Sequence, residues 1–412
     1  MRRVALVALC GAILAGLAVA IVIESAADHA APVRPQAALA WKPDSAEALS
    51  RQAERLLVAG ELSAARSAAK RALEHDPLEA RAIRVLGEAA ALEGNLASAR
   101  RLIAEAGRRS RSDVPAHQWL FHQRLADGDI KGALESLDGV VRTGDTAGGG
   151  LMTAMAVEAS RPDVMPQVVA MLATDPPWRY SFVRIFSAVA APSRSVDLIA
   201  ALRETRTPPT TEEYAVDINR ALRDGDYETG FLAWLMAIPK ARLGQLGYIY
   251  NGTFDPATDP EPFNWVLPVN RRLEATIAPN ATRDSSALHV IYAGVSTPRA
   301  SVKQMLLLPP GRYRLTGQES SEAIRGDQGA QWAVQCAARG VRTMLGQSTP
   351  LSAVSDWKPF TFDFEVPAQN CPAQWLILMR SAPEAAQSSI LIDVWYDDLS
   401  VSRLDATPPP RG

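Results

Sequence analysis

The sequence predicts a multidomain protein in which an N-terminal transmembrane helix is followed by an all-α region and then by an all-β antiparallel sandwich. Three observations support this fold class. An unbroken apolar run opens the chain, the alanine-rich middle repeats small residues at a fixed spacing, and the last part alternates β-branched and aromatic residues with turn residues. The 412 residues exceed the length of one typical domain, so we expect several folded units.

The composition narrows the possible functions. With 47% hydrophobic and 21% charged residues, the chain is neither disordered nor collagen-like. A formal net charge of −2 leaves no positive excess to neutralise a phosphate backbone, so a nucleic acid is not expected as a partner. Arginine greatly outnumbers lysine, which indicates a bacterial genome rich in GC.

Residues 1–24 predict a signal anchor. Two arginines precede the apolar run Val4–Ile23, which as a helix is long enough to cross the hydrocarbon core of a bilayer. The positive-inside rule then predicts a single-pass protein of the bacterial inner membrane with most of the chain in the periplasm. Cleaved signal peptides have shorter apolar regions, which favours a retained anchor; cleavage near Ser25-Ala26-Ala27 is the alternative.

Two segments predict little regular structure. Residues 25–44 contain Pro32, Pro35 and Pro43 among small residues, and we expect an extended stalk linker there. Residues 405–412 predict a disordered tail.

The middle of the chain contains an internal repeat. Gly60, Gly94 and Gly128 lie 34 residues apart, and an alanine follows each glycine at the fifth position, at Ala65, Ala99 and Ala133. Small residues at this spacing allow the two helices of a hairpin to approach closely. This pattern resembles the tetratricopeptide family, whose period is 34 residues. The resemblance implies a TPR-like solenoid over residues 45–239, with a degenerate second half that includes a further turn at Gly225-Asp226-Tyr227.

Solenoids of this kind present a surface to a protein segment, so the resemblance implies a protein partner in the cell envelope. Polar and basic residues of the predicted helices are the candidate contacts: Arg81, Arg84, His117, Gln118, His122 and Arg124. The alternative is that they are ordinary solvated helix positions. The two histidines are five residues apart, a spacing that does not direct both rings at one metal ion.

The composition changes near residue 243, and residues 243–404 predict an antiparallel β-sandwich. The strand-like runs are Tyr248–Phe254, Leu273–Ile277, Ala287–Tyr292, Val302–Leu308, Tyr313–Gly317, Gln331–Ala337, Phe360–Val366, Gln374–Met379 and Ile390–Val401. Each is short, and turn residues separate them.

The order of motifs in this region carries a second resemblance. The motifs begin with Asn251-Gly252-Thr253-Phe254 and Pro262-Phe263-Asn264-Trp265, continue through Pro310-Gly311-Arg312-Tyr313 and Asp356-Trp357-Lys358-Pro359, and close with Ile392-Asp393-Val394-Trp395-Tyr396. This succession resembles the galactose-binding-like jelly rolls that occur as carbohydrate-binding modules. The resemblance implies a jelly-roll sandwich and a glycan ligand.

Tryptophans supply the candidate glycan contacts, because flat rings stack on the apolar faces of sugars. Trp265 with its neighbour Asn264, and Trp357, lie near predicted loops and are the candidates. Trp332 and Trp375 alternate with apolar residues, so we expect both on inner faces of the sandwich. For every tryptophan a core position is the competing interpretation.

Two further expectations concern cross-links and ions. Cys336 and Cys371 lie in the same region and would form a disulfide in an oxidising compartment; two separate buried thiols are the alternative. The resemblance to carbohydrate-binding modules implies a structural calcium near Asp393, Asp397 and Asp398, against simple edge-strand polarity. No other cofactor or metal is expected.

No motif of a catalytic site is present in the sequence: it lacks a Gly-x-Ser-x-Gly elbow, a phosphate-binding glycine loop and a His-Glu-x-x-His helix. We therefore expect a non-catalytic, membrane-anchored adaptor that binds a protein through its solenoid and a glycan through its jelly roll. By analogy the setting is exopolysaccharide or surface-polysaccharide assembly. The alternative is a structural scaffold whose sandwich makes only protein contacts.

Overall fold

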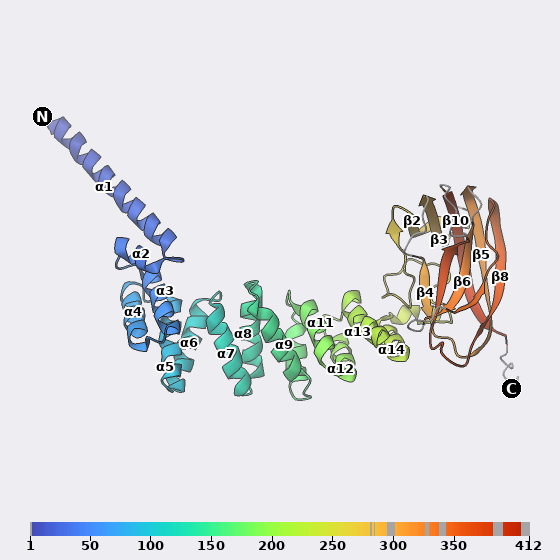
Figure 1. Cartoon of the computed structure of the whole chain (residues 1–412), viewed down its shortest axis with the longest axis horizontal. Helices are drawn as coiled ribbons and strands as arrows, with labels where there is room; N and C mark the ends of the chain where they lie inside the picture. Colours follow the sequence, from blue (N-terminus) through green and yellow to red (C-terminus); the bar gives the residue numbers. More distant parts are fainter. Residues whose placement is uncertain are drawn as a thin grey trace. The chain divides into compact units, whose positions relative to one another are not determined.

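The computed structural model describes residues 2–280, 282–283, 285–294, 301–325, 329–337, 343–381 and 390–404, and the predicted tail at 405–412 lies outside them. The chain divides into two compact units, Met1–Ile185 and Phe186–Gly412. The first unit is helical, and the second contains further helices followed by two antiparallel β-sheets (Figure 1). The predicted fold class, with one apolar N-terminal helix, a helical repeat region and a β-sandwich, is confirmed.

The N-terminal helix α1 (Arg2–Ala30) is the described helix that is long and apolar enough to cross a membrane, over Ile13–Ala30. Its last turn is part of the folded protein. Ala27 and Ala31 are fully buried beside α2 (Pro35–Trp41), and Lys42 pairs with Glu24. The expectation of an extended stalk at 25–44 is therefore wrong. The small side chains allow close helix packing, and Pro35 stands at the start of α2, where a proline is tolerated.

The repeat consists of helical hairpins. In chain order these are α3 (Ala46–Val58) with α4 (Leu62–His75), α5 (Ala80–Leu92) with α6 (Leu96–Arg109), and α7 (Val114–Ala126) with α8 (Ile130–Arg142). Gly60, Gly94 and Gly128 have φ of 80°, 80° and 77°, so each closes its hairpin in the left-handed region that glycine adopts without strain. The 34-residue period is thus the period of the hairpins.

Small side chains form the interior of these hairpins. Ala65, Ala99 and Ala133 are completely buried, as the close approach of paired helices requires. Gly87 in α5 marks the closest approach, because a Cβ atom there would lie 2.6 Å from Cγ1 of Ile103 in α6. The predicted role of small residues at the repeat positions is confirmed.

The period fades after α8, but helices continue. They are α9 (Ala147–Ala159), α10 (Met165–Leu172), α11 (Arg179–Val189), α12 (Pro192–Arg203), α13 (Thr211–Asp224) and α14 (Tyr227–Ala237). The turn at Gly225, with φ of 83°, joins α13 to α14, and Asp226 caps α14 by accepting from the Thr229 amide. This is the repeat-like turn that the sequence predicts. A short 3₁₀ helix, η1 (Lys240–Gln245), follows.

Two sheets face each other in the sandwich (Figure 1). The six-stranded sheet has the order β1-β2-β3-β10-β5-β8, and the four-stranded sheet has the order β4-β9-β6-β7. The strands are β1 (Val269–Asn270), β2 (Leu273–Asn280), β3 (Ser285–Gly294), β4 (Lys303–Leu306), β5 (Gly311–Arg325), β6 (Ala330–Cys336), β7 (Met344–Gln347), β8 (Ser355–Val366), β9 (Gln374–Arg380) and β10 (Ile390–Arg403). The described pairs are antiparallel, as predicted.

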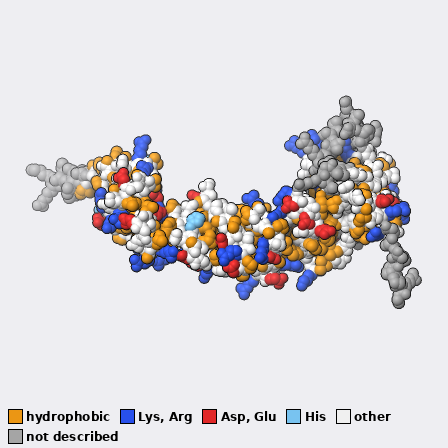
Figure 2. All heavy atoms as spheres, turned by 60° about the horizontal axis from the view of Figure 1, so that its bottom comes forward, with side chains coloured by type: hydrophobic (Ala, Val, Ile, Leu, Met, Phe, Trp, Pro, Cys, Tyr) orange, Lys and Arg blue, Asp and Glu red, His pale blue; other side chains and the backbone are white. Residues whose placement is uncertain are grey.

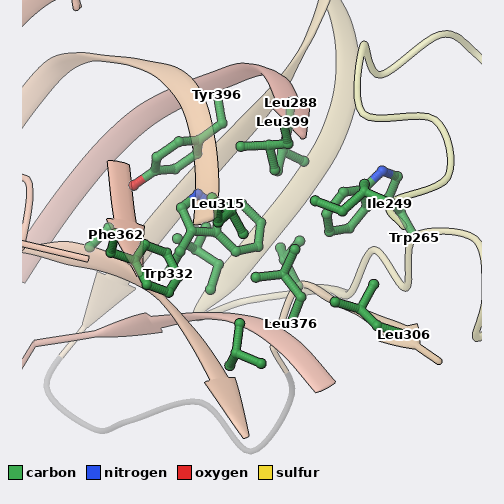
Figure 3. Close-up of a cluster of buried hydrophobic side chains, with 14 of the residues drawn as sticks. Ile249, Trp265, Leu288, Leu306, Leu315, Trp332, Phe362, Leu376, Tyr396 and Leu399 are labelled. Atoms are coloured by element: carbon green, nitrogen blue, oxygen red, sulfur yellow. The ribbon is translucent and has the colours of Figure 1, made fainter. Parts of the chain in front are cut away.

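Large side chains from both sheets fill the space between them (Figure 3). Trp332 of β6 and Tyr396 of β10 meet edge to face, with ring centroids 5.3 Å apart. Two details differ from the sequence prediction: residues 248–254 form turns rather than a strand, and the short strands β1 and β7 were missed. Both strands are too short to show a clear alternation.

Cys336 at the end of β6 and Cys371 before β9 form a disulfide, which confirms that prediction. A disulfide persists in an oxidising compartment. Together with the apolar helix α1, it indicates a location outside the cytoplasm.

Candidate ligand-binding groove

A groove of about 870 Å³ lies in the second unit between α13 and the sandwich. It is called the Trp375 groove below. Its lining comes from α13 and the start of α14, from residues 257–267, from β4 and β9, and from the residue after β6. The residues are Thr211, Glu212, Ala215, Asn219, Leu222, Arg223, Tyr227, Ala257, Thr258, Asp259, Pro260, Glu261, Pro262, Asn264, Trp265, Val266, Leu267, Lys303, Met305, Ala337 and Trp375. Its volume falls within the range of about 300–1,000 Å³ that is typical of ligand sites.

Trp375 of β9 supplies the aromatic surface of the groove. It is half-buried on the outer face of the four-stranded sheet, where it lies opposite Met305 of β4. The ammonium of Lys303 lies 4.3 Å from the centroid of the indole ring. This cation–π contact covers part of the ring, and the side chain as a whole stays partly exposed.

The expectation that Trp375 is an inner-face residue is wrong. The buried positions of β9 are Gln374, Leu376, Leu378 and Arg380, so Trp375 points outward with Ile377 and Met379. Gln374 is buried because its side chain bonds the backbone: its Oε1 accepts from the Leu308 amide at 2.9 Å, and its Nε2 donates to the Cys371 carbonyl at 3.0 Å. A glutamine with these partners occupies a core position, which reverses the pattern that polarity alone predicts.

Helix α13 forms the opposite wall because it has two different faces. Tyr214, Ile218 and Ala221 are buried on one face. Glu212, Ala215, Asn219 and Arg223 recur at three- and four-residue spacing on another, and all four line the groove. A capping box at Thr210 and Glu213 fixes the first turn of the helix beside the sandwich.

Side-chain contacts hold α13 and α14 against the sandwich. Trp234 donates from Nε1 to the Pro260 carbonyl at 2.9 Å, and Tyr227 donates from its hydroxyl to the Ala337 carbonyl at 2.9 Å. Phe263 packs against Trp234, with ring centroids 5.7 Å apart. The wall of the groove is therefore fixed in the folded chain and needs no ligand to position it.

Residues 255–264 form the floor beside this wall, and a buried carboxylate orders them. Asp259 accepts from the Arg242 guanidinium and from the Tyr250 hydroxyl, each at 2.7 Å. Burial and the neighbouring Asp259 carboxylate raise the pKa of Tyr250 above its ordinary value, so it stays a hydrogen-bond donor. Asn264 donates from Nδ2 to the Asp259 carbonyl at 3.2 Å.

Trp265 is a core residue, so its predicted role in stacking on a glycan is wrong. Only 3% of it is exposed, and its Nε1 donates to the Asn251 carbonyl at 2.9 Å. Its ring packs against Phe254 and Trp332, inside the sandwich (Figure 3). Asn264 is also buried, and its Oδ1 has no hydrogen-bond partner among the described residues.

Trp357 lies on β8 of the other sheet, outside the Trp375 groove. It is half-buried, and its Nε1 donates to the Thr282 hydroxyl at 3.0 Å. The guanidinium of Arg283 lies 4.7 Å from the centroid of its ring. The structure therefore does not bring the predicted candidates Trp265 and Trp357 into one site.

The protein-binding candidate Arg84 is buried, with 3% of its side chain exposed, and is not available to a partner. Its guanidinium pairs with Glu54 of α3, with Glu88 of α5 and with Asp113, which caps α7. Burial alone would lower the pKa of Arg84, but Asp113, Glu88 and Glu54 outweigh it and raise that pKa. Arg84 thus links three consecutive hairpins, and the expectation of a partner contact is wrong for this residue.

Of the other protein-binding candidates on the helices, some make contacts within the chain and others are exposed to solvent. Arg124 donates to the Gly132 carbonyl and to the Ser136 hydroxyl of α8, so it joins the two helices of its hairpin. His117 is half-buried, and burial lowers its pKa; Arg81 lies near Glu54. Gln118 is half-buried and His122 is exposed, so a partner contact through them stays a prediction. Figure 2 shows basic and acidic side chains interspersed over the helices.

The three aspartates predicted near a calcium already have partners. Asp393 contacts Nε2 of His289 at 2.7 Å, Asp397 contacts Nε of Arg283 at 2.9 Å, and Asp398 also pairs with Arg283. Within the described part of the chain, no group of three or more His, Cys, Asp or Glu side chains is placed to hold a metal ion. The predicted calcium role of these residues is therefore not supported, because Asp393 lies against His289 while Asp397 and Asp398 share Arg283.

The comparisons with known proteins concern parts of the fold. No family model and no curated protein matches the chain. Among solved structures, a family 4 carbohydrate-binding module is 16% identical, with 38% of this chain and 99% of that chain covered at a TM-score of 0.28. The C-terminal family 22 module of Clostridium thermocellum Xyn10B is 13% identical, with 41% and 99% covered at a TM-score of 0.29.

PilF of Pseudomonas aeruginosa is also similar in structure, at 12% identity, with 47% of this chain and 90% of that chain covered and a TM-score of 0.28.

Proposed function

We propose that this protein is a non-catalytic, membrane-anchored binding protein of the bacterial envelope. Its sandwich binds a linear glycan in the Trp375 groove, and its helical hairpins bind a protein segment. The setting we propose is the assembly of an exopolysaccharide or surface polysaccharide, in which one chain holds the polymer close to its machinery.

One observation carries the glycan proposal: Trp375 is a half-buried aromatic ring in a groove lined by both apolar and polar side chains. An indole offers a broad apolar surface to the apolar face of a sugar ring. Polar side chains around it, such as Asn219 and Lys303, are placed to bond hydroxyl groups. A site of this composition fits a ligand that is itself apolar on its faces and polar at its edges.

The retained anchor is supported by the packing of α1. Ala27, at the one candidate cleavage site, is fully buried in the folded protein, and Glu24 pairs with Lys42. Removal of residues before Ala27 would therefore take away part of a packed helix, not a free leader. We propose that α1 stays attached, with the bulk of the chain in the periplasm.

A second candidate function is a scaffold whose sandwich makes only protein contacts. The docking of α13 and α14 on the sandwich favours it, because Trp234 and Tyr227 show that this sandwich already binds helices of its own chain. The burial of Trp265 points the same way. The Trp375 groove distinguishes the two functions, since a scaffold has no need of a partly exposed ring in a groove with polar side chains around it.

The test is a glycan array probed with the full chain in detergent, as wild type, Trp375→Ala and Trp357→Ala. We expect the wild type to bind a set of linear glycans, and Trp375→Ala to lose them while Trp357→Ala keeps them. Retention of binding by Trp375→Ala would remove the groove as the site. Absence of binding by a folded wild type would favour the scaffold.

A further inference from the structure

We propose that α13 is part of the glycan site: Asn219 and Arg223 bond the same glycan whose ring stacks on Trp375. The smallest glycan-binding unit is then the sandwich together with α13, and the ligand class is an uncharged linear glycan. This inference rests on the proposed function. It adds that α13 contacts the ligand as the second wall of the groove, and that the ligand is uncharged.

The position of the two side chains follows from the periodicity of α13. Asn219 and Arg223 are four residues apart, so they lie one above the other on the helix surface. Both are exposed and both line the Trp375 groove. The buried face of the same helix, with Tyr214 and Ile218, fixes which side they occupy.

Neither side chain has a structural task that the described residues reveal. The side chains of Asn219 and Arg223 make no hydrogen bond or ion pair with another described residue, whereas the side chain of Arg220 on the same helix donates to the Ser187 carbonyl. An asparagine amide donates and accepts hydrogen bonds, and an arginine offers several donors in a plane. These groups suit adjacent hydroxyl groups of a sugar.

Helix α13, which forms the second wall of the groove, is attached to the sandwich at both ends. The Thr211 hydroxyl donates to the Thr258 carbonyl at 3.3 Å at one end of α13, and Tyr227 holds the Ala337 carbonyl just after its other end. Both ends of the helix are thereby fixed to the sandwich. A preorganised wall binds a ligand without the entropic cost of ordering it first.

The charges of the groove indicate an uncharged ligand. Arg223 and Lys303 are positive, Glu212 and Glu261 are negative, and Asp259 is compensated by Arg242. The two signs balance, so the groove has no net charge to attract a polyanion. Donors and acceptors are both present, as recognition of hydroxyl groups requires.

The experiment measures binding of xylohexaose, cellohexaose, mannohexaose and hexagalacturonate to the full chain in detergent by titration calorimetry. The variants are Asn219→Ala with Arg223→Gln, Trp375→Ala, and Asp224→Ala as a matched control at the exposed end of α13 outside the groove. We expect at least one neutral hexasaccharide to bind, and the double variant to bind it about tenfold more weakly or worse. The control should bind like the wild type.

The outcomes separate the two proposals. If Trp375→Ala loses binding but the α13 double variant keeps it, the inference about α13 is wrong and the proposed function stands. If Trp375→Ala binds like the wild type, or no hexasaccharide binds the wild type, the proposed function fails as well. Binding of hexagalacturonate alone would overturn the uncharged ligand class.

Folding of the variants is checked by their thermal unfolding midpoints. Because Asn219 and Arg223 are exposed, we expect midpoints equal to that of the wild type. Should the double variant unfold early, the single change Arg223→Lys keeps the charge but removes the planar donor group, and weaker binding by it is still expected.

Discussion

The two outer faces of the sandwich use tryptophan in different ways. On the six-stranded sheet, Trp395 stacks on His289 with ring centroids 4.0 Å apart, and its Nε1 donates to Glu322 at 2.9 Å. Trp357 on the same sheet is bound by Thr282 and covered by Arg283. On the four-stranded sheet, Trp375 has a contact with Lys303, and its indole N–H makes no hydrogen bond with a described residue.

This difference shows how a structural aromatic side chain is distinguished from a binding one. A tryptophan whose ring face and N–H group both have partners in the chain has no capacity left for a ligand. Trp395 is only 8% exposed, in agreement with a structural task. Trp375 also has a cation against its ring, at 4.3 Å, but its N–H group makes no hydrogen bond with a described residue and its side chain lines a groove. It therefore keeps a polar edge and part of its ring for a ligand.

The largest expected effect comes from replacing the structural tryptophan. Trp395→Ala should lower the free energy of unfolding by about 3–5 kcal/mol, because it empties a buried site, removes the donor to Glu322 and removes the ring that stacks on His289. Trp375→Ala should cost about 1 kcal/mol, because its ring is half-exposed. Urea unfolding of both variants measures the contrast. Equal losses would mean that the two faces do not differ.

A buried carboxylate inside the sandwich is expected to make the free energy of unfolding depend on pH. Glu319 of β5 is on the inner face opposite Tyr396, and burial raises its pKa to about 7, although Lys358 opposes this shift. At this group the folded protein then binds a proton more tightly than the unfolded chain. The contribution of Glu319 to stability is therefore fully present below its unfolded pKa of 4.5 and is lost as the pH rises through about 7.

We expect the wild type to lose about 2–3 kcal/mol of unfolding free energy between pH 5 and pH 8 relative to Glu319→Gln, which cannot ionise. Denaturant unfolding at several pH values measures this slope. Parallel pH profiles for the wild type and the variant would show that Glu319 titrates normally.

An intermediate effect is expected at the covered tryptophan. Arg283→Met removes the partner of Asp397, whose side chain is buried, and uncovers the ring of Trp357. The loss of unfolding free energy at pH 7 should be about 2 kcal/mol. Acrylamide should quench tryptophan fluorescence more strongly in this variant. An unchanged quenching constant would show that Arg283 does not shield the ring.

The smallest effect is expected at the binding face. Lys303→Met removes one cation–π contact at a partly exposed site, so stability should change by less than about 1 kcal/mol. The emission spectrum of Trp375 should nevertheless shift, because the positive charge of Lys303 is removed from beside its ring. Arg312→Met, at an exposed position of β5, serves as a control that leaves the spectrum as it is. A large loss of stability would mean that Lys303 is structural.

The helical hairpins could be predicted because their signal is local and repeated. Gly60, Gly94 and Gly128 each close one turn with the same backbone conformation, so the spacing of glycines is the spacing of hairpins. The helical packing of residues 25–44 could not be predicted in this way. Small residues such as Ala27 and Ala31 are equally typical of a linker, and only the neighbouring helix that packs on them shows that they are buried.

The candidate site was predicted less well, and the physical reason is the phase of β9. Alternation shows that Trp375 and Leu376 face opposite sides, but it does not show which side is the core. The hydrogen bonds of Gln374 decide this, and they involve Leu308 and Cys371, which are distant in sequence. The wall from α13 was missed for a similar reason, since its second polar stripe looks like a solvated face.

The proposed glycan site lies on the four-stranded face of the sandwich, in the Trp375 groove. Hydroxyl-radical footprinting of the full chain, with and without a glycan that it binds on the array, tests this most directly. We expect the glycan to protect Trp375 and to leave the oxidation of Trp357 unchanged. Protection of Trp357 with no change at Trp375 would contradict it.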